Sequence, residues 1–336
     1  MTTRVVPALG AGKRAEIDRA LRCLKDTSVL VVGDAMLDRY VYGSVHRISP
    51  EAPVPILSVE REVALPGGAG NVVRNLTALG IEVALVSVVG DDQTGSDLTG
   101  LVGGQPGVEP WLLVEGGRIT PLKTRFVSHG QQLLRADQEQ TTPIAPRLAE
   151  QLLRIARDAM VPTALTVLSD YGKGVLSPEL AARLIAAAHE AGRKVLVDSP
   201  AGGLACHAGA DVIMPTVQEL TEATGLPAET DAELTEAAAK LRNEGSFGAV
   251  LVLRGEAGLA LQDAEATYLF PYPPAELFDP SGLSDTVISA LAAGLAGGLA
   301  LPLAAEVAAL AASIARSRVG PAVVLPTDLL AALEGT

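Results

Sequence analysis

The sequence is poor in cysteine and histidine, and it contains no long apolar run. Its 336 residues include two cysteines, Cys23 and Cys206, and four scattered histidines. Two thiols cannot build a disulfide framework, and no histidine has a partner at a zinc-ligand spacing. No uninterrupted apolar stretch reaches the roughly 20 residues of a membrane-spanning helix, and residues 1–20 lack a secretory apolar segment. We therefore predict a cytoplasmic protein with idle thiols and no membrane span.

Positive charge is also scarce. The chain has 26 Lys and Arg against 39 Asp and Glu, a net charge of −13, which argues against a nucleic-acid partner because nucleic-acid phosphates are repelled. What the chain has instead is 48% hydrophobic residues, with 34 glycines and 22 prolines. This composition predicts one large core with many short turns, and no repeat or linker divides the chain. We expect a single domain over residues 1–336.

Short apolar runs rich in Val and Leu alternate with amphipathic helical segments along most of the chain. The runs end in Gly, Asp or Pro and cover residues 28–34, 82–92, 164–172, 194–200, 211–215 and 249–255. Helical patterns include 177–194, which opens on Ser177 as an N-cap and closes on Gly192, and 232–245. Strands without polar alternation, separated by helices, indicate a parallel sheet covered on both faces. The predicted fold class is α/β, doubly wound.

Two β-prone segments, residues 38–62 and 118–139, interrupt this alternation. Polar residues are interleaved in both, and no helical segment lies inside either. We predict that they form a small antiparallel sheet, a lid over the carboxyl edge of the strands, where open α/β sheets bind ligands. An exposed apolar face on such a lid would favour a homodimer. A pair of surface hairpins is the alternative.

The stretch LPGGAGNVVRNLTALG, residues 65–80, predicts a glycine turn that leads into a buried helix. It matches a dinucleotide-binding fingerprint only in part, because Val73 stands where the third glycine is required. Asn71, in the first turn of this helix, is either a ligand for a bound polyol or a solvated side chain.

A second glycine-containing turn, in residues 279–299, leads into an alanine-rich helix that begins near Asp285. Free N–H groups and the helix dipole attract anions at such a helix start, so a carboxylate there could orient a substrate hydroxyl beside a bound phosphate. An ordinary N-cap role for Ser284 and Asp285 is the competing interpretation.

Five segments together resemble the ribokinase-like (PfkB) sugar kinases: GDAMLDRY, RISPEAPVPIL, PGGAGNV, KTRFVSHGQQLLRAD and LSDYGKGVL. Within that family, RISPEAPVP and SDYGKG are similar to the D-glycero-β-D-manno-heptose 7-phosphate kinases of lipopolysaccharide core synthesis. The resemblance covers about residues 25–330 and implies a ribokinase-like fold and phosphorylation of a sugar phosphate by ATP with Mg²⁺. Such kinases are often fused to a nucleotidyltransferase, and this chain resembles the stand-alone kinase form.

The resemblance also implies site residues. Asp285 would be the base that takes the proton of the attacking hydroxyl, beside an anion hole at Gly282, Leu283 and Ser284. Sugar-phosphate contacts are implied at Asp34, Asp38, Gly67, Gly68, Asn71, Lys123, Arg125, Gln131, Arg135 and Lys173. ATP contacts are implied at Asp198, Thr216, Glu219, Arg254 and Gly255, with Glu219 also acting indirectly on the metal ion.

Three departures from the family pattern fall on the nucleotide side. The sequence has Gly282-Leu283-Ser284-Asp285 for Gly-Ala-Gly-Asp, Thr216-Val217-Gln218-Glu219 for Asn-x-x-Glu, and Asp198-Ser199-Pro200 for Asp-Pro-Lys. Ser284 adds a side chain where backbone approaches phosphate, and it would be strained if its φ had to be positive. Two functions remain open: a working kinase that retains Asp285 and Glu219, or a non-catalytic sugar-phosphate-binding regulator or scaffold.

Overall fold

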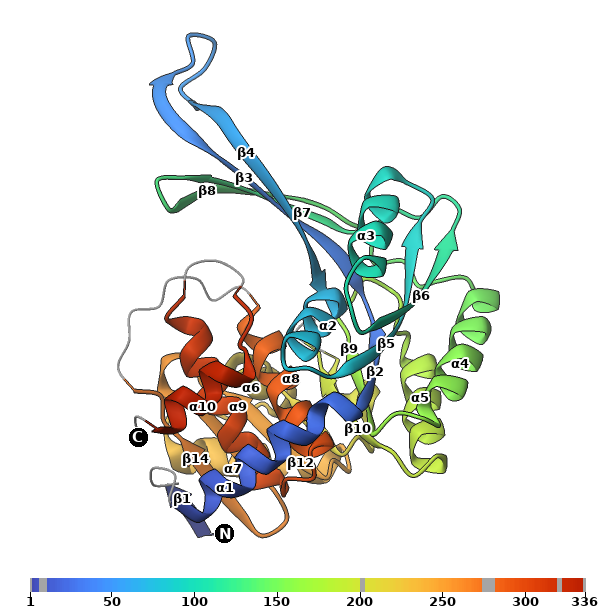
Figure 1. The fold of residues 1–336 in the computed structure, drawn as a ribbon, viewed down its shortest axis with the longest axis vertical. Coiled ribbons are helices and arrows are strands. Elements are labelled where there is room, and N and C mark those ends of the chain that lie inside the picture. The colour runs from blue at the N-terminus through green and yellow to red at the C-terminus, as the bar shows by residue number, and fades with distance from the viewer. Residues whose placement is uncertain (1, 6–10, 200–202, 274–281, 319–321, 335–336) are drawn as a thin grey trace.

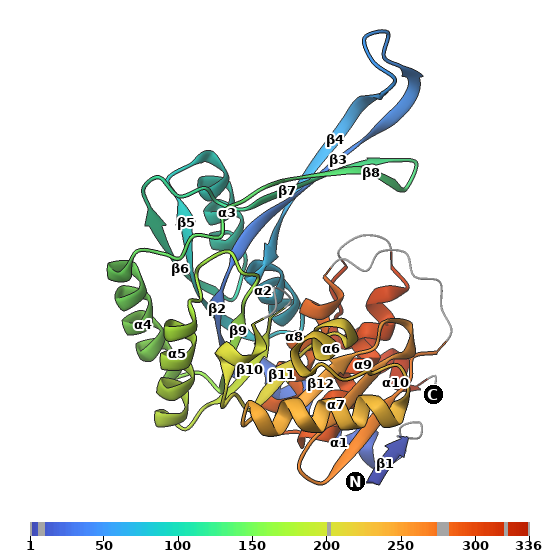
Figure 2. The ribbon, with the colours of Figure 1, turned by 180° about the vertical axis from the view of Figure 1, so that it is seen from behind.

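The protein was analysed as a computed structural model that describes residues 2–5, 11–199, 203–273, 282–318 and 322–334. These residues form an α/β domain from which a second, smaller sheet projects (Figure 1 and Figure 2). Pro200 and residues 279–281, on which part of the sequence analysis rests, lie outside the described residues.

Ten strands of the described residues form the central sheet, in the order β1-β14-β13-β12-β11-β10-β9-β2-β5-β6. Every strand runs parallel to the others except β13, which is antiparallel to both of its neighbours. The strands are β1 (Thr2–Val5), β2 (Ser28–Gly33), β5 (Glu82–Gly90), β6 (Val108–Glu115), β9 (Leu165–Ser169), β10 (Lys194–Asp198), β11 (Val212–Met214), β12 (Ala249–Leu253), β13 (Leu259–Gln262) and β14 (Ala266–Phe270). The prediction of a mostly parallel sheet is confirmed.

Helices cover both faces of this sheet. One face carries α1 (Ala11–Cys23), α2 (Ala69–Ala78), α3 (Gln93–Gly103), α8 (Leu283–Ala296), α9 (Leu301–Arg316) and α10 (Pro326–Glu334). The other carries α4 (Pro146–Met160), α5 (Pro178–Glu190), α6 (Val217–Thr224) and α7 (Asp231–Glu244). Three short 3-10 helices span Leu24–Asp26, Leu204–His207 and Gly255–Ala257. The sheet is therefore doubly wound, as the sequence predicts.

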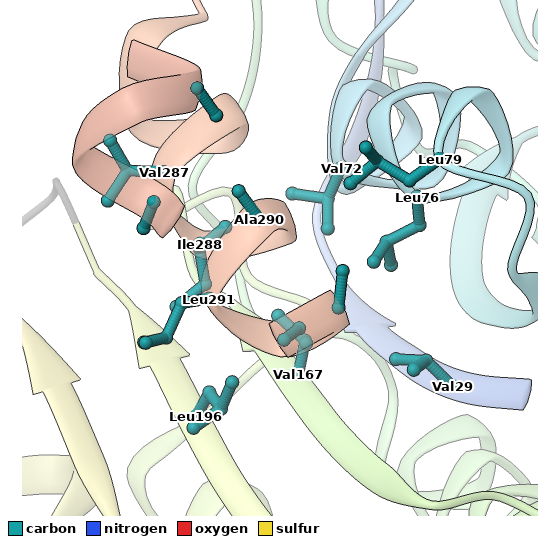
Figure 3. Packing of buried hydrophobic residues seen from close by; sticks show 14 of the residues in the cluster. Val29, Val72, Leu76, Leu79, Val167, Leu196, Val287, Ile288, Ala290 and Leu291 are labelled. Carbon is teal, nitrogen blue, oxygen red and sulfur yellow. The ribbon is translucent and has the colours of Figure 1, made fainter. Parts of the chain in front are cut away.

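The strands lack polar alternation because both of their faces are buried. In β9, Val167 packs into the core beneath α2 and α8, whereas the next residue, Leu168, packs into the core beneath α4 and α5. Leu76 of α2 and Leu291 of α8 lie over the strands in the first of these cores (Figure 3). Each such side chain, fully removed from water, stabilises the fold by about 1.5–3 kcal/mol.

The projecting sheet has four strands in the order β4-β3-β7-β8. They are β3 (Ala35–Ile48), β4 (Pro55–Gly68), β7 (Leu122–Ser128) and β8 (Gln131–Gln138). A sheet at the predicted segments is confirmed, but a purely antiparallel sheet is wrong. Strands β3 and β4 form one antiparallel hairpin, β7 and β8 form another, and the two hairpins join through a parallel β3–β7 pair. After β5, α3 and β6, the chain returns to the lid as β7, which runs in the same direction as β3.

Local signals at several element ends are confirmed. Ser177 is the N-cap of α5, where its hydroxyl accepts a hydrogen bond from the Leu180 N–H, and Gly192 follows the helix at φ +71°.

Cys23 and Cys206 are free thiols. Across the described ranges, no helix is long and apolar enough to cross a membrane.

Candidate active site

The candidate site lies at the carboxyl edge of the central sheet, where the chain order reverses. Strand β2 has β5 and β6 on one side and β9 to β12 on the other, and such a switch point is where open α/β sheets bind ligands. Asp34 follows β2, Asp170 follows β9, Asp198 ends β10 and Arg254 follows β12. Parallel pairing brings these strand ends to one edge, although they span more than half of the sequence.

Asp285 occupies the third position of α8 and is 3% exposed. Its Oδ2 accepts a hydrogen bond of 2.7 Å from Asn71 Nδ2, and its Oδ1 accepts one of 2.7 Å from the Tyr171 hydroxyl. Burial raises the pKa of Asp285 to about 6, although these two hydrogen bonds favour the charged form. The N-cap of α8 is Gly282, so the capping interpretation of Ser284 and Asp285 is wrong.

Asn71 reaches Asp285 because the first turns of α2 and α8 lie side by side. Ser289 of α8 donates to the Val72 carbonyl at 3.2 Å, which ties the two helices together. Asn71 is 6% exposed, and its Oδ1 accepts a 2.8 Å hydrogen bond from Arg74. The solvated interpretation of Asn71 is therefore wrong. Sequence reasoning missed Arg74, whose spacing of three residues from Asn71 in a helix was the available signal.

The inner end of the lid brings further predicted residues to this place. Asp38 of β3 forms a close ion pair with Arg125 of β7, and Gly67 lies so near that a β-carbon there would collide with the Asp38 carboxylate. Gly68, at φ +55°, passes equally close to the backbone of Asp34. The two glycines thus allow β4 to cross the site and enter α2.

The predicted lysines lie at the margin of this polar cluster. Lys123 contacts Asp137 at 3.2 Å and Glu139 at 3.3 Å, and Lys173 contacts Glu139 at 2.8 Å. Glu139 therefore links the lid to the loop that follows β9. Both cations are held near the site by carboxylates that an incoming phosphate would have to displace or share.

Two predicted residues lie farther out. Gln131, in the register of Gly43, is five residues beyond Asp38 along the lid, or about 17 Å at the usual rise of a strand. Arg135 is half exposed and pairs with Asp137 at 2.9 Å. Gln131 therefore lies far along the lid from Asp38, and the predicted roles of Gln131 and Arg135 in sugar binding stay predictions.

Asp34 is 1% exposed, and its carboxylate accepts hydrogen bonds from three backbone N–H groups of the next loop: Tyr171 and Lys173 at 2.9 Å and Val175 at 3.0 Å. Burial raises the pKa of Asp34 to about 6 against the effect of these bonds. The Asp34 side chain, which the sequence predicted to bind sugar hydroxyls, thus binds the backbone of the loop at residues 170–175.

Part of the predicted nucleotide set, without Asp198 and Glu219, lines a cavity of about 620 Å³ beside the start of α8. Thr216, Arg254, Gly255, Leu283 and Ser284 line it, together with Tyr272, which sequence reasoning missed. Arg254 forms a close ion pair with Asp231 of α7. The cavity thus joins the end of β12 to the start of α8.

Glu219 does not line this cavity. Thr216 and Glu219 form a capping box at the start of α6, in which Thr216 N–H donates to Glu219 Oε2 at 2.7 Å and Glu219 N–H donates to Thr216 Oγ1 at 3.2 Å. The T-x-x-E pattern was the sequence signal for this box. Across the described ranges, no group of three or more His, Cys, Asp or Glu side chains is placed to hold a metal ion by itself.

The substituted residues of the expected anion hole fit the backbone without strain. Ser284 is helical, and the positive φ of this turn, +76°, falls on Gly282. The Ser284 side chain lies near enough to Asp198 to favour its charged form, and Asp198 is 1% exposed and has a buried Oδ2 without a partner. Burial first, and then the negative charges of Asp285 and Glu219, raise the pKa of Asp198. A side chain at position 284 therefore contacts the end of β10.

Comparison with known proteins decides the family. The profile described as pfkB family carbohydrate kinase matches residues 26–328. The chain belongs to the PfkB family of carbohydrate kinases. Members of this family use ATP. The resemblance found in the five sequence segments is confirmed at the family level.

Among curated proteins, this PfkB chain is similar to two proteins named "Bifunctional protein HldE". It is 54% identical over 315 residues to that of Acidiphilium cryptum, covering 94% of this chain and 65% of the relative. It is 49% identical over 312 residues to that of Paramagnetospirillum magneticum, covering 92% of this chain and 64% of the relative. The chain thus spans slightly less than two thirds of the length of these relatives.

Solved structures share the fold. Phosphofructokinase-2 from Escherichia coli in complex with substrates and products superposes with a TM-score of 0.78 at 20% identity, covering 92% of this chain and 99% of that one. Arabidopsis thaliana ribokinase complexed with ribose and ATP superposes with a TM-score of 0.71 at 22% identity, with the same coverages. The ribokinase-like fold of this PfkB chain is thereby confirmed.

Proposed function

We propose that this chain transfers the γ-phosphoryl group of ATP to D-glycero-β-D-manno-heptose 7-phosphate at its anomeric hydroxyl, giving the 1,7-bisphosphate. The observation that carries the proposal is the position of Asp285. It is a buried carboxylate at the start of α8, near enough to Asp38 of the lid for that charge to act on it, and it directly follows Leu283 and Ser284, which line the 620 Å³ cavity. The choice of heptose rests on the RISPEAPVP and SDYGKG segments and on relatives named HldE.

In the proposed reaction, the sugar hydroxyl attacks the γ-phosphorus while Asp285 takes its proton. A new sugar-oxygen to phosphorus bond forms, the bond from the γ-phosphorus to ADP breaks, and ADP leaves. Such transfer depends on positioning and on stabilising charge rather than on covalent catalysis. The free N–H groups in the first turn of α8, at Leu283 and Ser284, would supply that stabilisation.

A magnesium ion would neutralise charge on the β- and γ-phosphates. Magnesium usually keeps several waters and binds through one or two carboxylates together with substrate phosphates. The described residues offer no cluster of three or more carboxylate, imidazole or thiol ligands, and isolated carboxylates lie near the site instead. This arrangement fits an ion that enters bound to ATP. We propose that Glu219 contacts this ion through water, since one of its oxygens is already used by the Thr216 N–H.

A homodimer through the lid is part of the same proposal. Ile48, Val59 and Leu134 of the lid sheet are each more than half exposed, which is costly for a free surface. A lid that pairs with a second copy would also shelter the site from water.

The second candidate is a sugar-phosphate-binding regulator or scaffold that lacks turnover. It is favoured by the substitutions at Ser199, Thr216 and Ser284, all on the nucleotide side, while the sugar side keeps the family pattern. Each lost donor or cation would cost a few kcal/mol of transition-state stabilisation.

Calorimetric titration with ATP–Mg²⁺ and with heptose 7-phosphate, in separate experiments, tests the two functions. We expect both ligands to bind and the mixture to release ADP. Sugar binding without nucleotide binding or turnover would select the regulator. Turnover with fructose 6-phosphate but not with the heptose would retain the kinase and reject the substrate.

A further inference from the structure

Hydrogen bonds to one carboxylate, that of Asp34, hold the backbone of the loop at residues 170–175, between β9 and α5, in one conformation. Three of its N–H groups donate to the single carboxylate of Asp34, at 2.9–3.0 Å, and Gly172 and Gly174 take the left-handed conformations that the loop requires. The Gly172 N–H also donates to Asp170 at 2.9 Å. A buried acceptor for several donors holds a loop in one conformation, because releasing it would leave a buried charge unpaired.

This rigid loop presents one side chain to the reaction centre. The Tyr171 hydroxyl donates to Asp285 Oδ1 at 2.7 Å, while Asn71 holds Oδ2 at the same distance. The Ser284 side chain also lies near the Tyr171 hydroxyl. The carboxylate of Asp285 is therefore fixed by two neutral donors, one from α2 and one from the loop held by Asp34.

We propose that Tyr171 is a positioning residue for the phosphoryl transfer, which orients the Asp285 carboxylate and keeps it ionised, and that Asp34 acts on the reaction through Tyr171. This inference rests on the proposed kinase function. It adds two contributions to that function: a role for Tyr171, which lies in the SDYGKG segment but was given no role from the sequence, and a role in catalysis rather than in sugar contact for Asp34.

The charges around Asp285 explain why a neutral donor is needed there. Asp38 of β3 is a negative neighbour of Asp285, and Arg74 of α2 is a positive one. Asp198 of β10 is a further nearby carboxyl group, whose own pKa is raised by burial and by the charge of Asp285. Burial and the charge of Asp285 raise the pKa of Tyr171, so its hydroxyl stays protonated and remains a donor. Without that hydrogen bond, burial would favour the protonated acid, which cannot accept the proton of a sugar hydroxyl.

Tyr171→Phe tests the inference, because it removes the hydroxyl and keeps the ring. We expect kcat to fall by about 10-fold or more, the scale of a hydrogen bond to a charged group, with KM values for ATP and sugar phosphate within about twofold. The acid limb of the kcat/KM–pH profile should move to higher pH by about one unit. Tyr268→Phe, at a tyrosine of β14, which four other strands separate from β9 in the sheet, is the matched control and should change neither value.

A second measurement does not depend on turnover. Carbon-13 NMR of aspartate carboxyl groups can follow the titration of Asp285 in the free protein, with Asp285→Asn used to assign its signal. We expect a higher midpoint in Tyr171→Phe than in the wild type, and a similar rise in Asp34→Asn, in which one of the two oxygens that accept the loop N–H groups becomes an NH2 donor. An unchanged midpoint with unchanged kcat would overturn the inference. Wild-type protein that fails to turn over ATP would instead reject the proposed function, and the midpoint would still decide the role of Tyr171.

Discussion

At the scale of single residues, the site depends on keeping a carboxylate charged in a place that disfavours charge. Asp285 and Asp34 are both nearly inaccessible to water, and burial raises the pKa of each to about 6. A base with such a pKa is largely ionised at pH 7 and is still basic enough to share a proton in the transition state. Burying these two carboxylates in their charged form lowers the free energy of unfolding of the protein.

Asp285→Asn should cut kcat by about 10² or more, because a positioned general base supplies that much of the rate. Sugar binding should remain nearly intact, since the amide can still meet Asn71 and Tyr171. Steady-state kinetics and calorimetry on the same preparation check the two parts. Turnover equal to that of the wild type would remove Asp285 from the mechanism.

The same variant makes a prediction about stability. The pKa of Asp285 is raised on folding from 3.8 to about 6, so the folded state binds more protons than the unfolded state between these pH values. Its contribution to stability is therefore fully present below about pH 4 and is lost as the pH rises through about 6. We expect the free energy of unfolding of the wild type to fall by about 3 kcal/mol relative to Asp285→Asn between pH 4 and pH 7.

Urea unfolding of both proteins at several pH values measures this difference. Asp34 titrates in the same range, but it is common to both proteins and cancels in the comparison. A difference that is independent of pH would mean that Asp285 does not carry the raised pKa.

At the scale of elements, the backbone of the turn that opens α8 is important for the shape of the site. Gly282 has φ +76°, and a β-carbon there would lie 2.5 Å from Asn71 Nδ2. Gly282→Ala should therefore lose about 1 kcal/mol of stability through strain and, in addition, most of the turnover through displacement of Asn71.

Gly298→Ala is the matched control for this prediction. Gly298 follows the same helix at φ +86°, but a β-carbon there meets nothing within 4 Å. It should show a similar loss in thermal unfolding with unchanged kcat. Equal kcat in the two variants would mean that the Gly282 turn has no role in the reaction.

The substituted turn can also be restored towards the family pattern. Ser284 is unstrained, so Leu283→Ala with Ser284→Gly relieves nothing, and it removes a hydroxyl that lies beside the buried groups Asp198 and Tyr171. We expect no rise in kcat and a loss of about 1–3 kcal/mol in urea unfolding, the cost of an unsatisfied buried group. A marked rise in kcat with unchanged sugar affinity would indicate instead that the substitutions weaken an ATP site.

At the scale of the whole molecule, the exposed apolar residues of the lid sheet are the basis of the proposed dimer. Leu134→Glu places a charge on the exposed part of β8 and should turn the proposed dimer into a monomer in light scattering. Val161→Glu, at an equally exposed apolar position after α4, should leave the mass unchanged. A monomeric wild type at high concentration would contradict the dimer itself.

Much of the fold was predictable because it depends on local patterns. The two-sided burial of Val167 and Leu168 explains why apolar runs without alternation indicate a covered parallel sheet. Ser177 and Gly192 mark the ends of α5 by their own chemistry. The parallel β3–β7 junction was not predictable, because pairing between distant hairpins leaves no local pattern.

The sequence by itself determined the fold class and the family, because motifs and periodicity are carried along the chain. It also indicated that Asp285, Asn71 and Asp38 belong to one candidate site. Only the tertiary structure decided what these residues do to one another. The contact from Tyr171 to Asp285 spans 114 positions, and that from Asn71 spans 214. Such contacts arise when parallel pairing and helix packing bring strand and helix ends to one edge. Their geometry then decides which carboxylate binds backbone, as Asp34 does, and which remains beside the cavity, as Asp285 does.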